Sequence, residues 1–185
     1  MKRTFVAIKI EVFDKMEILI NKIKEELKDE KIRWVDFKNL HLTLFFIGDT
    51  SEDLIHKVRK SLRANLSNIE GFNLNCESLG VFRNIYCPRA IWFGFKDSVK
   101  LQILKTVIDR SLKELGDFNE ERAFKPHLTI GRTKDIKDKD KLKALMLDFE
   151  NLKIDEFQIK EIIFYESILT SKGAIYKEID KFQLS

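Results

Sequence analysis

Two copies of one short motif constrain this chain more than any other feature. Each copy is a histidine, an apolar residue, a threonine and another apolar residue: HLTL beginning at His41 and HLTI beginning at His127, an offset of 86 in a chain of 185 residues. Side chains alternate between the two faces of a β-strand, so each histidine shares a face with its own threonine, Thr43 or Thr129. We therefore expect two matching strands, each with one polar and one apolar face.

A similar order of strand and helix patterns surrounds both motifs. Alternation and helical periodicity predict strands at 5–10, 32–35, 40–47, 72–79, 90–95, 128–131, 157–165 and 174–181, and helices at 11–28, 99–115 and 139–149, with another helix after Thr50 or Ser51 along the stripe Leu54, Val58, Leu62 and Leu66. Each half then reads as a split β-α-β-β-α-β unit. The expected fold class is α+β, a bilobal duplication of split β-α-β units with two antiparallel sheets flanking a central cleft.

The organisation of the chain predicts one domain. No low-complexity segment or long linker separates the halves, so we expect a single domain over 1–185, with lobes at about 1–85 and 86–185 related by a pseudo-two-fold axis. No segment approaches the roughly 20 apolar residues that a membrane span needs. We expect a cytoplasmic monomer without a membrane partner, and its net charge of +4 permits a polyanionic partner.

Paired histidines and threonines suit the hydrolysis of a phosphodiester. One imidazole can take a proton from the attacking water while the other gives a proton to the departing oxygen, because the pKa of histidine lies near working pH. The hydroxyls of Thr43 and Thr129 can donate hydrogen bonds to the non-bridging oxygens. Arg132, after the second motif, and Lys125, before it, are candidates for a positive charge near the phosphate.

Plainer interpretations compete with this hypothesis. A single strand histidine is usually a packed or surface residue, and the threonines could simply be β-branched strand formers. Recurrence at matching positions favours the catalytic interpretation. The third histidine, His56, lies among basic residues on an expected helix, and we interpret it as a surface residue. None of the three histidines has the spacing of a zinc site, so we expect no metal and no cofactor.

An ordered set of segments resembles one known family over nearly the whole chain. In chain order the matching segments are 3–7, Trp34, 39–44, 80–82, 90–92, 124–132 and 165–167. The sequence resembles the 2H phosphoesterases, and within them the RNA 2′,3′-cyclic phosphodiesterases, which are also called 2′-5′ RNA ligases.

The resemblance implies a reaction, a partner and roles for residues. The reaction is hydrolysis of a 2′,3′-cyclic phosphate at an RNA end to a 2′-phosphate, and proteins of this type can also join or cleave 2′-5′ linkages. Carried over by motif, His41 is the proton donor and His127 the proton acceptor. The residues alone cannot order the two, because the motifs are chemically near-equivalent. RNA is the expected partner, with Thr43, Thr129 and Arg132 binding phosphate.

Base recognition and substrate identity stay open at the level of sequence. Trp34, Phe45 and Tyr165 are candidates for stacking on the terminal base, with core packing as the competing interpretation of each. Another cyclic phosphate or an RNA tail is an alternative substrate within the same superfamily. A non-catalytic RNA-binding module is a further alternative, although no segment matches the pattern of an RNA recognition motif.

Overall fold

The structure is a computed structural model that describes residues 1–96, 98–116, 118, 123–150, 152–171 and 173–185. Its elements, in chain order, are β1 (Lys2–Lys9), α1 (Asp14–Glu26), β2 (Lys31–Trp34), the 3-10 helix η1 (Phe37–Asn39), β3 (His41–Thr50), α2 (Glu52–Leu66), β4 (Phe72–Phe82), β5 (Ala90–Phe95), α3 (Val99–Lys113), β6 (His127–Asp135), α4 (Lys139–Asp148), β7 (Lys153–Ile159), β8 (Glu161–Thr170) and β9 (Gly173–Gln183).

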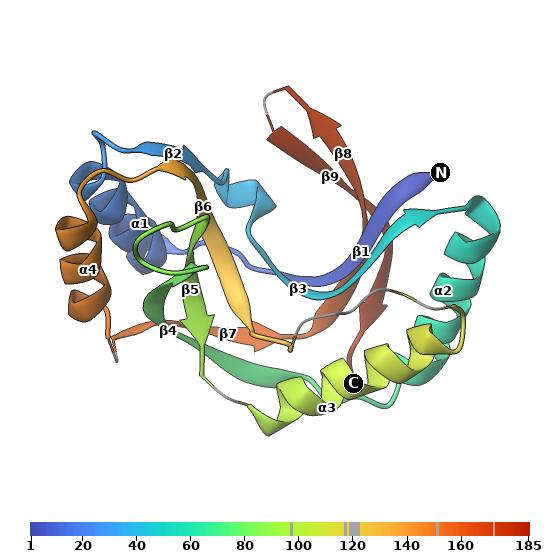
Figure 1. Ribbon diagram of the computed structural model, residues 1–185. Helices are drawn as coiled ribbons and strands as arrows, with labels where there is room; N and C mark the ends of the chain where they lie inside the picture. Colours follow the sequence, from blue (N-terminus) through green and yellow to red (C-terminus); the bar gives the residue numbers. More distant parts are fainter. Residues whose placement is uncertain (97, 117, 119–122, 151, 172) are drawn as a thin grey trace.

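The strands form two antiparallel sheets. Sheet A has the order β3-β1-β8-β9, and sheet B has the order β2-β6-β5-β4-β7. The two sheets diverge, with the β8–β9 hairpin rising on one side and β2 with β6 on the other (Figure 1). Each motif strand thus faces the space between the sheets, and the expected α+β fold with two antiparallel sheets is confirmed.

Helices cover the outer sides of both sheets because each has one apolar stripe. α1 buries Met16, Ile20 and Ile23 and contacts β7 of sheet B, while α4 contacts β4 of the same sheet. α2 and α3 pack against each other and against β9 and β3 of sheet A. The buried apolar side chains of these helices and of the strand faces that they cover merge into one continuous core, and a second small cluster of Phe5, Ala7, Ile163 and Tyr165 lies apart from it.

The sheets do not coincide with the halves 1–85 and 86–185. Sheet A combines β1 and β3 with β8 and β9, and sheet B combines β2 and β4 with β5, β6 and β7. The expected boundary between the lobes does not separate the two sheets, because β4 belongs to the first half of the chain and pairs with β5 of the second half. The chain returns to sheet A at Lys160, which splits the single strand expected at 157–165 into β7 and β8.

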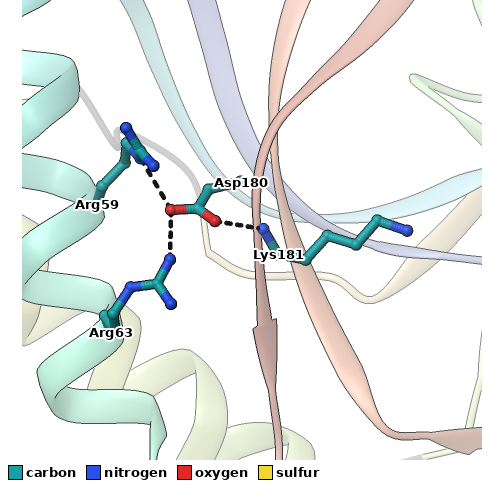
Figure 2. Close-up of polar contacts among 4 residues, drawn as sticks. All are labelled: Arg59, Arg63, Asp180 and Lys181. Carbon is teal, nitrogen blue, oxygen red and sulfur yellow. Dashed lines mark hydrogen bonds and ion pairs between the residues drawn. The ribbon is translucent and has the colours of Figure 1, made fainter.

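An ion-pair cluster fixes α2 to the outer strand of sheet A. The Asp180 carboxylate on β9 accepts hydrogen bonds from Arg59 Nε at 2.8 Å and from Arg63 Nη2 at 2.7 Å, and its other oxygen accepts from the backbone N–H of Lys181 at 2.9 Å (Figure 2). Burial raises the pKa of Asp180, but these donors outweigh it and hold the pKa below its usual value. The cluster anchors the strand whose other end forms part of the cleft described below.

Candidate active site

Both motifs begin their strands and pair with one antiparallel neighbour, although β3 is the edge strand of sheet A and β6 lies between β2 and β5 in sheet B. On β3, His41 pairs with Lys9 and Thr43 with Ala7 of the neighbouring strand β1. On β6, His127 pairs with Gly94 of β5, and Thr129 pairs with Trp92 two residues earlier on that strand. All four motif side chains are half-buried, while the apolar residues between them are buried. The expected sharing of one strand face by each histidine and its threonine is confirmed.

A β-bulge falls on the last residue of each motif. In β3 the register jumps between Thr43 and Phe45, so that Leu44 is the extra residue, and in β6 it jumps between Thr129 and Gly131. A bulge reverses which face later side chains occupy. Strict alternation would place the fifth residue after each histidine on the opposite face of the strand. Because of the bulges, Phe46 in β3 and Arg132 in β6 instead share the face of the motif histidine and threonine.

Both histidine rings are held by the same backbone interaction. His41 Nδ1 lies 2.7 Å from the carbonyl oxygen of Asn39, and His127 Nδ1 lies 2.7 Å from that of Lys125. A carbonyl oxygen can only accept a hydrogen bond, so Nδ1 carries the proton in both rings. Nε2 of each ring is then the atom that can accept or donate a proton to a substrate.

Aromatic side chains pack around both imidazoles. The His41 ring centroid lies 5.0 Å from that of Phe5 and 4.9 Å from that of Tyr176, which meets it edge-on. The His127 ring meets Phe82 edge-on at 4.5 Å and lies 6.5 Å from Trp92. These apolar surroundings remove water from the imidazoles and restrict their rotation.

Burial lowers the pKa of both histidines. For His41 burial is the largest effect, the hydrogen bond to Asn39 opposes it, and the charges of His127 and Arg132 lower the pKa further. For His127 burial again dominates, the hydrogen bond to Lys125 opposes it, and Arg132 and Lys125 lower the pKa. Each imidazole therefore favours its neutral form, and the charge of Arg132 lowers the pKa of both rings.

A cleft of about 830 Å³ opens beside the first motif. His41, Thr43, Arg132 and Trp34 line it, so four of the predicted site residues meet there. The described residues that line this cleft do not include His127 or Thr129. Strands β3 and β6 are nevertheless in contact, and the charge of His127 is felt at His41. His127 is thus close enough to His41 for its charge to lower the His41 pKa.

Two of the expected stacking residues are wrong. Phe45 is only 1% exposed and meets Phe118 edge-on in the core, because the bulge in β3 turns it away from the motif face. Tyr165 is 6% exposed, and its ring stacks at 5.2 Å on that of Phe5, its partner on the neighbouring strand β1. Neither ring has a face open to a base. Trp34 remains a candidate because it lines the cleft.

Sequence reasoning missed several residues that line the cleft. Phe46 is 44% exposed, and the Arg3 guanidinium lies 5.0 Å from the centre of its ring. Tyr176 and Ile175 come from β9, whose role in the site no motif revealed. The offset of 86 residues offered one usable signal, because Phe46 and Arg132 occupy equivalent positions in the two copies of the repeat.

Asn39 connects the first histidine to the β8–β9 hairpin. Its carbonyl holds His41, while its side-chain Nδ2 donates to the carbonyl oxygen of Ala174 on β9 at 3.1 Å. Lys125, the equivalent of Asn39 before the second motif, instead places its Nζ 4.4 Å from the ring centre of Trp92. The backbone role is therefore shared, and the side-chain roles differ.

The described part of the chain offers neither a membrane-spanning helix nor a metal cluster. None of its helices has the length and apolar character required to cross a membrane. Within the same residues, no three His, Cys, Asp or Glu side chains gather in a group that could hold a metal ion.

Comparison with known proteins identifies the family. A model of the 2′-5′ RNA ligase superfamily matches residues 12–167. The RNA 2′,3′-cyclic phosphodiesterase of Methanocaldococcus jannaschii is 37% identical over 180 residues, which cover 97% of this chain and 99% of that protein. The protein of the same name from Methanothermobacter thermautotrophicus is 30% identical over 184 residues, covering 98% of each.

Solved structures share the fold at lower identity. E. coli LigT complexed with 3′-AMP superimposes with a TM-score of 0.77 at 23% identity, over 100% of this chain and 98% of that one. The protein TT0787 of Thermus thermophilus gives 0.78 at 20% identity, over 98% and 97%. Together with the paired histidine motifs, these matches show that the chain belongs to the 2′-5′ RNA ligase superfamily of 2H phosphoesterases.

Proposed function

We propose that this protein hydrolyses the 2′,3′-cyclic phosphate at an RNA end to a 2′-phosphomonoester. The observation that carries the proposal is the matched pair of motif strands, with both Nδ1 atoms held by backbone carbonyls and Arg132 acting on both imidazoles. The names of the relatives from Methanocaldococcus and Methanothermobacter support the same activity.

The two imidazoles would divide the proton transfers. One must be neutral to accept the proton of the attacking water at Nε2, and the other must be protonated to give a proton to the leaving oxygen. Their pKa values are both lowered in the unliganded protein, so a bound phosphate anion is needed to favour the protonated ring. Thr43 and Thr129 would donate their hydroxyls to the non-bridging oxygens, and Arg132 would add positive charge.

The position of the cleft supports one order of acid and base. In an in-line displacement the water attacks opposite the leaving O3′, which is attached to the ribose. The nucleoside has room in the cleft that His41 lines together with Phe46 and Tyr176. His41 then gives the proton to O3′ as the P–O3′ bond breaks. His127, on the other side of phosphorus, takes the proton of the water whose oxygen becomes bonded to phosphorus.

Hydrolysis of a defined RNA end tests the proposal. An oligoribonucleotide with a 2′,3′-cyclic phosphate is incubated with the protein in EDTA, and the position of the phosphate in the product is determined. We expect a 2′-phosphate, with losses of about 10²–10⁴-fold in kcat for His41→Ala and His127→Ala. His56→Ala on α2 is the matched control and should retain full activity. An intact cyclic end, or full activity of either motif variant, would overturn the proposal.

The remaining candidates give different results in the same assay. A protein that acts on another cyclic phosphate would leave this end intact but turn over another member of a substrate panel. A non-catalytic RNA-binding protein would bind RNA without any turnover. Ligation of 2′-5′ ends is a separate activity, and joining of RNA ends that carry a 2′,3′-cyclic phosphate and a 5′-hydroxyl would detect it.

A further inference from the structure

Two arginines face each other across the ladder that enters the cleft. Arg33 on the edge strand β2 pairs with Arg132 on β6, and both line the cleft. Like charges placed directly opposite on neighbouring strands are destabilising. At the start of β2 the same ladder pairs Lys31 with Asp135, which is the favourable combination. The unfavourable combination therefore occurs where the strand pair meets the site.

The protein supplies little negative charge to offset these arginines. Asp36 is the acidic residue among the described side chains that line the cleft, and its carboxylate lies 3.1 Å from Lys38 Nζ. Arg33 and Arg132 have no carboxylate partner among the described residues, and neither does Arg3, which lies over the Phe46 ring. The cleft thus carries more positive charge than one phosphodiester anion would neutralise.

We propose that Arg33 binds a second phosphate, that of the linkage between the terminal and the penultimate nucleotide of the substrate. The inference rests on the proposed function, because Arg132 is assigned there to the phosphate that reacts. Arg33 lies one strand farther out than Arg132 in sheet B, at the edge of the sheet. A strand of RNA that leaves the reacting phosphate toward this edge brings its next phosphate to the Arg33 guanidinium, which can hold it through paired hydrogen bonds.

The arrangement selects oligonucleotide ends over mononucleotides. A nucleoside 2′,3′-cyclic monophosphate contains the reacting phosphate alone, whereas a dinucleotide with a 2′,3′-cyclic end adds the linking phosphate. Arg33 contributes to binding of the second compound and not of the first. Its effect therefore appears in the ratio of kcat/KM for the dinucleotide to kcat/KM for the mononucleotide.

The test compares Arg33→Gln with the wild type on both substrates. We expect the ratio to fall about tenfold, as for the loss of one charged hydrogen-bonding contact, while kcat/KM for the mononucleotide stays within about twofold. Arg110→Gln is the control, because Arg110 is exposed on α3 and is absent from the described residues that line the cleft. An unchanged ratio in Arg33→Gln, or an equal loss on both substrates, would overturn the proposal.

Two further measurements separate this proposal from a structural role and from the reaction itself. Relief of the like-charge pair should leave the melting temperature of Arg33→Gln equal to or above that of the wild type, whereas a structural role would lower it. Binding of a dinucleotide with a 2′-phosphate end should lose about 0.7 from its slope against log salt concentration in Arg33→Gln. This slope tests Arg33 even if neither cyclic substrate is hydrolysed, and an unchanged slope would contradict the proposal.

Discussion

The contact between Gly80 and Trp92 gives a stability prediction that depends on the second motif. Gly80 on β4 pairs with Trp92 on β5, and the indole ring lies across the glycine. A Cβ built on Gly80 would stand 2.2 Å from Trp92 Cη2 and 2.3 Å from Cζ2, far inside van der Waals contact. The indole is buried, and its other neighbours include Phe82, His127 and the Lys125 ammonium. Gly80→Ala therefore has to displace the ring toward the motif face of β6.

The size of the effect follows from the cost of overpacking a core. An added methyl group that forces a buried ring to move costs about 1–3 kcal/mol. For a chain of this length each kcal/mol lowers the melting temperature by about 2–4 °C, so we expect a decrease of roughly 2–12 °C. Because Trp92 faces Thr129 across the ladder, kcat/KM should fall as well.

A double-mutant cycle isolates the clash. Thermal unfolding is measured for the wild type, Gly80→Ala, Trp92→Leu and the double variant. The smaller leucine removes the clash, so Gly80→Ala should cost almost nothing in that background, and the coupling free energy should be about 0.5–3 kcal/mol. An equal cost of Gly80→Ala with Trp92 and with leucine would show that the ring is not what excludes the methyl group.

Three other predictions concern the two histidines and the cleft. Both imidazoles have lowered pKa values, the histidine that acts as base is inactive below its pKa, and the histidine that acts as acid is inactive above its pKa. The pH profile of kcat/KM should therefore peak below about pH 6.5. Arg132→Gln removes a charge that lowers both pKa values, so it should move the peak to higher pH. A peak that does not move, or moves equally in Arg110→Gln, would exclude this role. Phe46→Ala should raise KM about tenfold through lost stacking, with an unfolding free energy within about 0.5 kcal/mol of the wild type. The adjacent Phe45→Ala should lower the unfolding free energy by about 3–5 kcal/mol. Similar unfolding costs for the two variants would contradict the bulge that buries Phe45 and exposes Phe46. Asn39→Ala removes the donor to Ala174 but keeps the carbonyl that holds His41, so KM should rise while the pH profile stays unchanged, and a shifted profile would contradict the separation of the two roles.

The local sequence pattern predicted the two motif strands well, because the prediction requires only the alternation of polar and apolar side chains along each strand. The shared face of His41 and Thr43, and that of His127 and Thr129, follow from the period of two and hold in the structure. The bulges did not follow, since a bulge is a property of the ladder formed with a distant strand. Phe45 was consequently assigned to the cleft in place of Phe46.

Long-range pairing was the second limit. The repeat suggested that each half folds on itself, but β4 pairs with β5 and β7, and β8 pairs with β1. Pairing between strands of different halves leaves the alternation within each strand unchanged, so the periodicity of the sequence cannot detect it. Tyr176 was missed for this reason, because it reaches His41 only when β9 lies beside β8 in sheet A.

The central claim is that two imidazoles act on opposite sides of one phosphorus atom, with His41 serving the leaving oxygen. The most direct measurement uses a substrate in which sulfur replaces the bridging 3′-oxygen of the cyclic phosphate, because a thiolate departs without a proton. His41→Ala should be slow on the oxygen substrate and recover most of its activity on the sulfur substrate, while His127→Ala should stay slow on both. Equal rescue of the two variants, or rescue of His127→Ala alone, would contradict the assignment.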